Sequence, residues 1–86
     1  MYKIILHKNA AKFFQNADSK LKDRLTKAID EISINPHFNV HIKKLKGELS
    51  SKSRYRLGEI RILFEIHEEL KIVRIAAIEA RGSVYK

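Results

Sequence analysis

Three arginines in the second half of the chain, Arg54, Arg56 and Arg61, are the side chains best suited to chemistry. A two-residue hairpin turn at Gly58–Glu59 would place Arg56 directly opposite Arg61, with Arg54 on the same face of the strands. Like charges in that position destabilise a sheet by up to about 1 kcal/mol, so folding alone does not favour the pattern. Planar guanidinium groups bind phosphate oxygens in pairs, which indicates a phosphate-binding surface. The alternative is that these arginines extend into water or pair with Glu65 and the glutamate of the turn.

Arg81 and Tyr85 form a second candidate group, beyond the last predicted strand. Gly82 allows a sharp turn at that point. Beside a basic face, the arginine could clamp a phosphate and the tyrosine could stack on a base. Equally, the tyrosine could pack on the sheet edge while Arg81 pairs with Glu79. The residues alone leave both interpretations open.

The charge of the chain is strongly positive, and its distribution narrows the class of partner. The 18 Lys and Arg against 10 Asp and Glu give a formal net charge of +8. Residues 37–61 hold seven of these cations against two glutamates: Lys43, Lys44, Lys46, Lys52, Arg54, Arg56 and Arg61. Such a segment favours polyanions, whether nucleic acid, an acidic protein or an anionic membrane surface. The alternative is a basic surface that keeps the protein soluble and binds no partner, which would have the same composition.

Composition argues against several other classes of protein. The 86 residues contain no Cys, so no disulfide framework, zinc ribbon or thiol nucleophile is expected. The spacing of the four histidines matches no metal-ligand motif: His7, His37, His41 and His67. The longest apolar run is Ile75–Ile78, far short of the roughly 20 residues that span a bilayer, and no signal peptide opens the chain. The sequence therefore predicts one soluble, intracellular domain.

The apolar pattern predicts the first elements that must position these groups. Residues 2–7 are short and rich in branched side chains, which predicts a strand. Asn9 is a suitable N-cap for a helix, and Asp18 or Ser19 for a second one, which Asn35–Pro36 ends. The apolar positions at helical spacing are Ala10, Phe13, Phe14 and Ala17 in the first helix and Leu21, Leu25, Ala28, Ile29 and Ile32 in the second. We expect an antiparallel helical hairpin with basic outer faces.

The rest of the chain predicts a sheet. Residues 37–53 show no convincing period, so residues 41–47 are expected to be a loop or irregular edge, held to the core by Ile42 and Leu45. From Arg54 a period of two predicts a hairpin with a type II′ turn at Gly58–Glu59, and then a third strand over residues 71–78. The inward positions of the hairpin are Tyr55, Leu57, Ile60, Ile62, Phe64 and Ile66. The predicted fold class is α+β, with an N-terminal strand and a helical hairpin packed on a mostly antiparallel, roughly four-stranded sheet.

The face of this sheet away from the helices is not expected to be purely polar. Continuing the register places Ile72 and Ile78 on the same side as Arg61, beside Arg74. Apolar residues next to a basic patch indicate a surface that a further layer or a partner covers. A groove there would take an acidic amphipathic helix as readily as a nucleic acid backbone.

Three segments of the sequence resemble the RelE/ParE superfamily of toxins from bacterial and archaeal toxin–antitoxin modules: residues 45–47, 55–66 and 80–86. The hairpin sequence YRLGEIRILFEI followed by RGSVYK is similar to the RelE branch, and the close of the chain is most like archaeal-type RelE proteins. The resemblance covers nearly the whole chain. It implies a single RelE-like toxin domain over residues 1–86 with the RelE-like microbial RNase fold.

The RelE resemblance implies a ribosome-dependent endoribonuclease that cuts messenger RNA in the decoding site with no metal or other cofactor. A ribose 2′-hydroxyl would attack the adjacent phosphorus, leaving a 2′,3′-cyclic phosphate or 3′-phosphate and a 5′-hydroxyl. The implied catalytic residues are Arg61, Arg81, Tyr85, Arg56 and Lys52, and the implied nucleic-acid-binding residues are Lys43, Lys44, Lys46, Arg54 and Arg74. Arg61 and Arg81 would neutralise charge on the phosphorane with help from Arg56, while Tyr85 would orient the scissile nucleotide.

The same resemblance leaves the general base open. An arginine is too basic to accept the proton, so Lys52 as a neutral amine, or His41 if its loop folds inward, are the candidates. Some members of the family carry lysines at the positions of Arg54 and Arg56, and some have their functional arginine where Glu79 stands.

The ParE branch shares the fold but poisons DNA gyrase, so a gyrase inhibitor with no nuclease activity is the alternative. A basic nucleic-acid-binding relative without toxicity is a third hypothesis. Either toxin implies a hetero-oligomer with a cognate antitoxin, for which an acidic amphipathic helix would suit the basic surface. The nuclease further implies the ribosome and messenger RNA as partners, a cytoplasmic location and no membrane partner.

Overall fold

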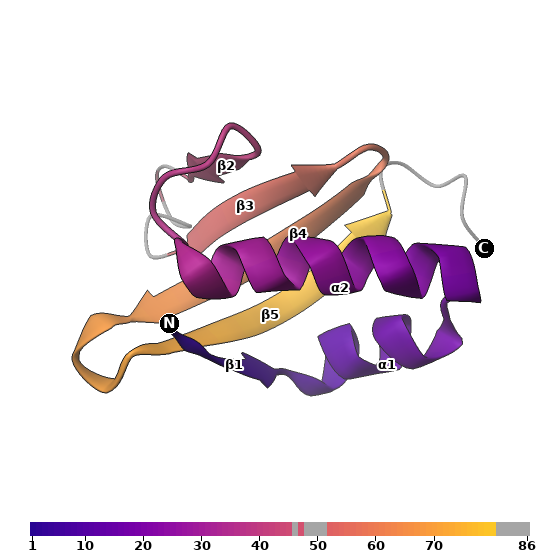
Figure 1. Ribbon diagram of the computed structural model, residues 1–86, viewed down its shortest axis with the longest axis horizontal. Helices are drawn as coiled ribbons and strands as arrows, with labels where there is room; N and C mark the ends of the chain where they lie inside the picture. The colour runs from indigo at the N-terminus through magenta and orange to yellow at the C-terminus, as the bar shows by residue number, and fades with distance from the viewer. Residues whose placement is uncertain (46, 48–51, 81–86) are drawn as a thin grey trace.

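The computed structural model describes residues 1–45, 47 and 52–80, which build a five-stranded sheet with two helices on one face (Figure 1). The strands are β1 (Lys3–Leu6), β2 (Ile42–Lys44), β3 (Lys52–Leu57), β4 (Ile60–His67) and β5 (Ile72–Ala80), and the helices are α1 (Lys8–Asn16) and α2 (Ser19–Ile34). The order across the sheet is β1-β5-β4-β3-β2. Among these described strands, β1 and β5 are parallel and the other neighbours antiparallel. The predicted α+β class and mostly antiparallel sheet are confirmed.

The two helices follow the predicted apolar faces. Asp18 caps α2, because its carboxylate accepts the backbone N–H of Leu21 at 2.8 Å. The cap of α1 is His7 rather than Asn9, since the Nδ1 atom of His7 accepts the N–H of Asn9 at 3.3 Å. Four helical residues are fully buried against the sheet: Ala10, Leu25, Ala28 and Ile32. Neither described helix has the length and hydropathy needed to cross a bilayer.

The central hairpin has the predicted register. Leu57 pairs with Ile60 and Arg56 with Arg61, so Gly58–Glu59 is the two-residue turn. Gly58 has a φ of +59° and Glu59 is not in the positive-φ region, which agrees with a type II′ turn and not with type I′. The buried positions of β3, β4 and β5 join the helical residues in one core: Tyr55, Ile60, Ile62, Phe64, Val73, Ile75 and Ile78.

The fifth strand, β2, lies where the sequence predicted a loop or irregular edge. Ile42 pairs with Tyr55, Lys43 with Arg54 and Lys44 with Ser53, which extends the sheet beyond β3. Ile42 packs partly against the core, as expected. A strand of three residues is too short to show a period of two, and its ladder depends on β3.

A β-bulge in β5 overturns one part of the predicted register. Leu63 of β4 pairs with Ala77 and the next residue, Phe64, pairs with Ile75, so Ala76 is an extra residue in β5. Ile72 lies on the face away from the helices, as predicted, because it pairs with exposed His67. Ile78, predicted on that same face, lies instead in the core with 6% of its surface exposed. The extra residue reverses the alternation after position 76.

The end of the sheet at the β4–β5 turn carries a polar cluster around Glu68. Its carboxylate accepts hydrogen bonds from Nζ of Lys71 at 2.8 Å and from the Tyr2 hydroxyl at 2.6 Å, and lies 2.8 Å from Nε2 of His37. The bond from Lys71, followed by those from Tyr2 and His37, lowers the pKa of Glu68 to about 2. Lys71 itself has a φ of +54° after the short 3₁₀ turn Glu68–Leu70. The cluster therefore ties together the start of the chain, the segment after α2 and this turn.

Candidate functional site

The face of the sheet opposite the helices, here called the outer face, collects the predicted arginines. Arg56 lies across from Arg61, and Arg61 lies across from Glu79 of β5, so these three residues form one row over three strands. Arg54 is on the same side two residues before Arg56, and Lys43 of β2 lies directly across from it. The alternation of the strands thus brings Arg54, Arg56 and Arg61 to one surface.

Arg61 is held by a carboxylate in this row. Its Nη2 atom donates to Oε1 of Glu79 at 3.1 Å, and the two side chains are 46% and 45% exposed. The sequence offered Glu79 as a partner for Arg81 and offered Glu65 and the turn glutamate as partners for the hairpin arginines. The bulge turns Glu79 to the outer face, where it contacts Arg61. Arg81 lies outside the described residues, so its predicted pairing with Glu79 stays a prediction.

Glu65 forms a second ionic group on the outer face. Its carboxylate accepts a hydrogen bond from Nζ of Lys52 at 2.6 Å and lies 3.5 Å from Nη1 of Arg74 and 3.8 Å from Nε2 of His67. The hydrogen bond from Lys52 and the charges of Lys52, Arg74 and His67 hold the pKa of Glu65 below its usual value, against the effect of burial. Lys52 and Arg74 are therefore already engaged by an internal anion.

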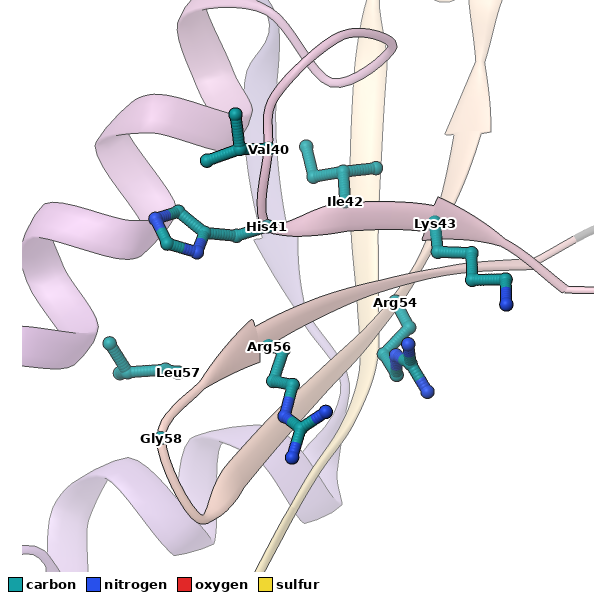
Figure 2. A pocket seen from close by; sticks show the side chains of 8 residues that line it. All are labelled: Val40, His41, Ile42, Lys43, Arg54, Arg56, Leu57 and Gly58. Carbon is teal, nitrogen blue, oxygen red and sulfur yellow. The ribbon is translucent and has the colours of Figure 1, made fainter.

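The cations closest to the β2 edge line a groove (Figure 2). This hollow of about 520 Å³ is bounded by Val40, His41, Ile42, Lys43, Arg54, Arg56, Leu57 and Gly58. A smaller hollow of about 250 Å³ lies next to it, lined by Arg54, Arg56, Gly58 and Arg61. Figure 2 shows Arg54 and Arg56 pointing to the same side of β3. Both arginines border both hollows, which makes them the centre of the site.

The groove cations lack internal partners within the part of the chain that the structure describes. No described carboxylate lies within ion-pair distance of Lys43, Arg54 or Arg56. The Nε atom of Arg54 is buried and has no hydrogen-bond partner among the described residues. A buried donor without an acceptor is costly and unusual in a native protein. A bound anion in the groove would satisfy it.

The fold of this chain matches solved structures of known proteins, although the sequence matches no known family profile and no curated protein. The RelE–RelB complex from Pyrococcus horikoshii OT3 aligns with a TM-score of 0.80 and 23% identity over 96% of this chain and 98% of that one. The RelBE2 toxin–antitoxin complex from Mycobacterium tuberculosis aligns with a TM-score of 0.80 and 22% identity, over 93% of this chain and 98% of the matched chain. The isolated E. coli RelE toxin aligns with a TM-score of 0.81 and 17% identity, over 99% of this chain and 89% of the toxin. The chain has the RelE fold.

On this RelE fold, the predicted site residues divide into four groups. Arg54, Arg56, Arg61 and Lys43 share the outer face around the two hollows. Lys52 and Arg74 also lie on the outer face, but in the row of Glu65. Lys44 pairs with buried Ser53 and so lies on the opposite side of β2 from Lys43. Lys46, Arg81 and Tyr85 lie outside the described residues.

The two predicted candidates for general base, Lys52 and His41, each contact another side chain in the structure. Lys52 donates to Glu65 at 2.6 Å, so its amine is held by a carboxylate in the row of Glu65 and not beside Arg56 and Arg61. His41 lines the groove, but its ring is directed toward the helices in Figure 2, with its centroid 5.3 Å from that of Tyr55. Burial raises the pKa of Tyr55 to about 12, and its hydroxyl donates to Glu31 of α2 at 2.8 Å. His41 therefore belongs to the helix side of the sheet edge.

Sequence reasoning missed two carboxylates of the outer face as parts of the site. The outer-face position of Glu65 follows from the alternation of β4, so its place next to Lys52 and Arg74 could have been predicted from the sequence. The outer-face position of Glu79 could not be derived in this way, because the alternation of β5 changes at Ala76. No residue near that point marks a bulge.

Proposed function

We propose that this protein is the toxin of a type II toxin–antitoxin module and a metal-independent endoribonuclease that cleaves messenger RNA on the ribosome in the cytoplasm. The observation that carries the proposal is the convergence of Arg54, Arg56 and Arg61 on the outer face of a RelE fold. Arg56 and Arg61 lie directly opposite one another, a repulsive arrangement that folding does not require. Guanidinium groups grouped in this way suit the bidentate binding of phosphate.

The chemistry follows from the position of the nucleophile inside the substrate. A ribose 2′-hydroxyl attacks the adjacent phosphorus, so the protein has only to orient the linkage and neutralise negative charge on the phosphorane. In the proposal Arg61 and Arg56 contact the non-bridging oxygens. The buried Nε of Arg54 supplies a further donor to a backbone phosphate. Lys43 extends the positive surface along the RNA.

Arg81 and Tyr85 complete the proposed site. In the proposal Arg81 adds a cation at the phosphorane and Tyr85 stacks on or orients the scissile nucleotide. These two roles rest on the resemblance of RGSVYK to the RelE branch, since both residues lie outside the described part of the chain.

The test is primer extension on cellular messages after induced expression of the protein. Wild-type protein is expected to give codon-linked cleavage ends within translated messages and to arrest growth. Arg61→Ala and Arg81→Ala are each expected to reduce cleavage by about 10²–10³-fold, the cost of removing one charge-stabilising donor. Lys27→Ala, which removes one positive charge from an exposed position on α2, is the matched control and should leave cleavage unchanged.

The same experiment separates nuclease activity from the alternative target. Intact messages together with double-strand breaks in DNA would replace the nuclease by a ParE-like gyrase inhibitor. Intact messages, intact DNA and normal growth would leave an inactive relative of the toxins.

The proposal includes an antitoxin partner. The RelE proteins from Pyrococcus horikoshii and Mycobacterium tuberculosis were each solved as a complex with an antitoxin. A net charge of +8 favours an acidic partner segment electrostatically, and Val40, which is exposed and lines the groove, offers apolar area there. Co-purification with the product of the neighbouring reading frame, lost in about 1 M salt if the contact is mainly electrostatic, tests this partner.

A further inference from the structure

The proposed cleavage requires a group that removes the proton of the attacking 2′-hydroxyl. Arginine cannot do so, because its guanidinium stays protonated in proteins. The ammonium of Lys52 is bound to Glu65 at 2.6 Å, and the ring of His41 lies on the helix side of the sheet edge. The residues that the sequence suggested therefore leave the base unassigned.

Glu79 is the carboxylate that the bulge turns toward the candidate site. It lies opposite Arg61 and in the same row as Arg56, and its Oε1 is 3.1 Å from Nη2 of Arg61. Its side chain is 45% exposed, so the remaining lone pairs are open to a substrate on the outer face. Glu65, a second described carboxylate of this face, instead has Lys52, Arg74 and His67 as its ionic neighbours.

We propose that Glu79 is the general base of the reaction, an inference that rests on the proposed nuclease function. Glu79 takes the proton of the 2′-hydroxyl while the O2′–P bond forms, the P–O5′ bond breaks with its electron pair on O5′, and O5′ takes a proton from solvent. The protonated carboxyl then returns its proton to water, so the products are the cyclic phosphate and a 5′-hydroxyl. Carboxylates are common general bases, and such a group contributes about 10²–10⁴-fold to a rate.

The pairing with Arg61 suits this role. Arg61 can hold Glu79 through one nitrogen and present its other donors to a non-bridging phosphate oxygen, which places base and phosphate on one guanidinium. A purely structural role predicts something else. An exposed ion pair contributes little to folding, and a carboxylate that only neutralised Arg61 would compete with phosphate and lower activity.

Single-turnover cleavage of messenger RNA on programmed ribosomes tests the assignment with wild-type protein, Glu79→Gln and Glu79→Asp. Glu79→Gln keeps the shape of the side chain and is expected to slow cleavage by about 10²–10⁴-fold, while binding to the ribosome changes less than about twofold. Its pH–rate profile should lack the acidic limb that we expect for the wild-type protein. Glu79→Asp keeps a carboxylate at a shorter reach and is expected to retain that limb at an intermediate rate.

The control is Glu59→Gln, which removes one negative charge from the exposed turn of the hairpin. It should change neither the rate nor the profile. A Glu79→Gln variant that cleaves as fast as wild type or faster, with an unchanged pH profile, overturns the role as base and leaves the neutralisation of Arg61. A wild-type protein that cleaves no RNA overturns the proposed function itself, and that failure is visible before any variant is compared.

Discussion

The repulsion between Arg56 and Arg61 predicts that one substitution raises stability while it lowers activity. Arg56→Gln keeps most of the side-chain length and removes one of two like charges that lie directly across the hairpin. Like charges in such pairs cost up to about 1 kcal/mol. Glu79 already offsets part of the charge on Arg61 at 3.1 Å, so we expect a gain of about 0.5 kcal/mol or less in the free energy of unfolding. For a domain of this size that gain corresponds to a rise in Tm of at most about 2–4 °C.

Thermal unfolding followed by circular dichroism measures this gain, and salt dependence identifies its cause. The increase in Tm should appear in about 0.01 M salt and vanish in about 1 M salt, where the Debye length falls to about 3 Å. Lys44→Gln is the matched control, because Lys44 is an exposed strand lysine that faces Ser53 and no charge. It should leave Tm nearly unchanged.

A double-mutant cycle decides whether the two arginines interact. Arg56→Gln should stabilise the wild-type protein but not a protein that already carries Arg61→Gln. An equal gain in both backgrounds, or a gain that survives in high salt, would refute the electrostatic reasoning and leave a difference in strand preference. Messenger RNA cleavage by Arg56→Gln should fall even though its Tm rises, which is the behaviour of a residue kept for function.

Three further substitutions test the fold and its pH dependence. Glu68→Gln removes the carboxylate of the polar cluster, whose pKa is about 2 in the folded protein against an ordinary value of 4.5. The stabilisation that this carboxylate provides is present above about pH 4.5 and is lost as the pH falls toward 2. The urea midpoint of the variant should therefore fall less steeply between about pH 5 and 2 than that of the wild-type protein. Gly58→Ala should lower the free energy of unfolding by about 1 kcal/mol in urea titration, because Gly58 has a φ of +59° and an added Cβ would lie 3.1 Å from Nη2 of Arg24. Phe64→Ala empties the centre of the core and should cost about 3–5 kcal/mol, visible as loss of the cooperative thermal transition, whereas a small shift in Tm would contradict the packing.

The hairpin and the helices could be predicted from the sequence because local signals agree there. Between Arg54 and Ile66 the period of two, the glycine of the turn and the branched side chains all specify the same register. The same agreement holds in α2, where Asp18 caps a helix whose apolar residues recur at helical spacing. The outer-face position of Arg54, Arg56 and Arg61 followed directly from this register.

The strand β2 could not be predicted from the apolar pattern of the sequence. Ile42–Lys44 has three residues, and its pairing depends on the long-range ladder with β3 rather than on its own composition. The groove beside it, between Lys43 and Arg54, was therefore unpredictable as well. Its basic composition was evident in the sequence, but its shape was not.

The position of Glu79 shows how one residue of register can decide the chemistry of a site. Ile75–Ile78 is a continuous apolar run, so it contains no alternation that reveals which residue is skipped. A shift of one residue moves every later side chain to the other face, and the bulge at Ala76 thereby exchanges the positions that Ile78 and Glu79 would have had. Without the bulge, Glu79 would be a charge directed toward the helices and Ile78 would be exposed beside Arg61. Because the bulge buries Ile78 and brings Glu79 within 3.1 Å of Arg61, the same packing that completes the core also supplies the candidate base.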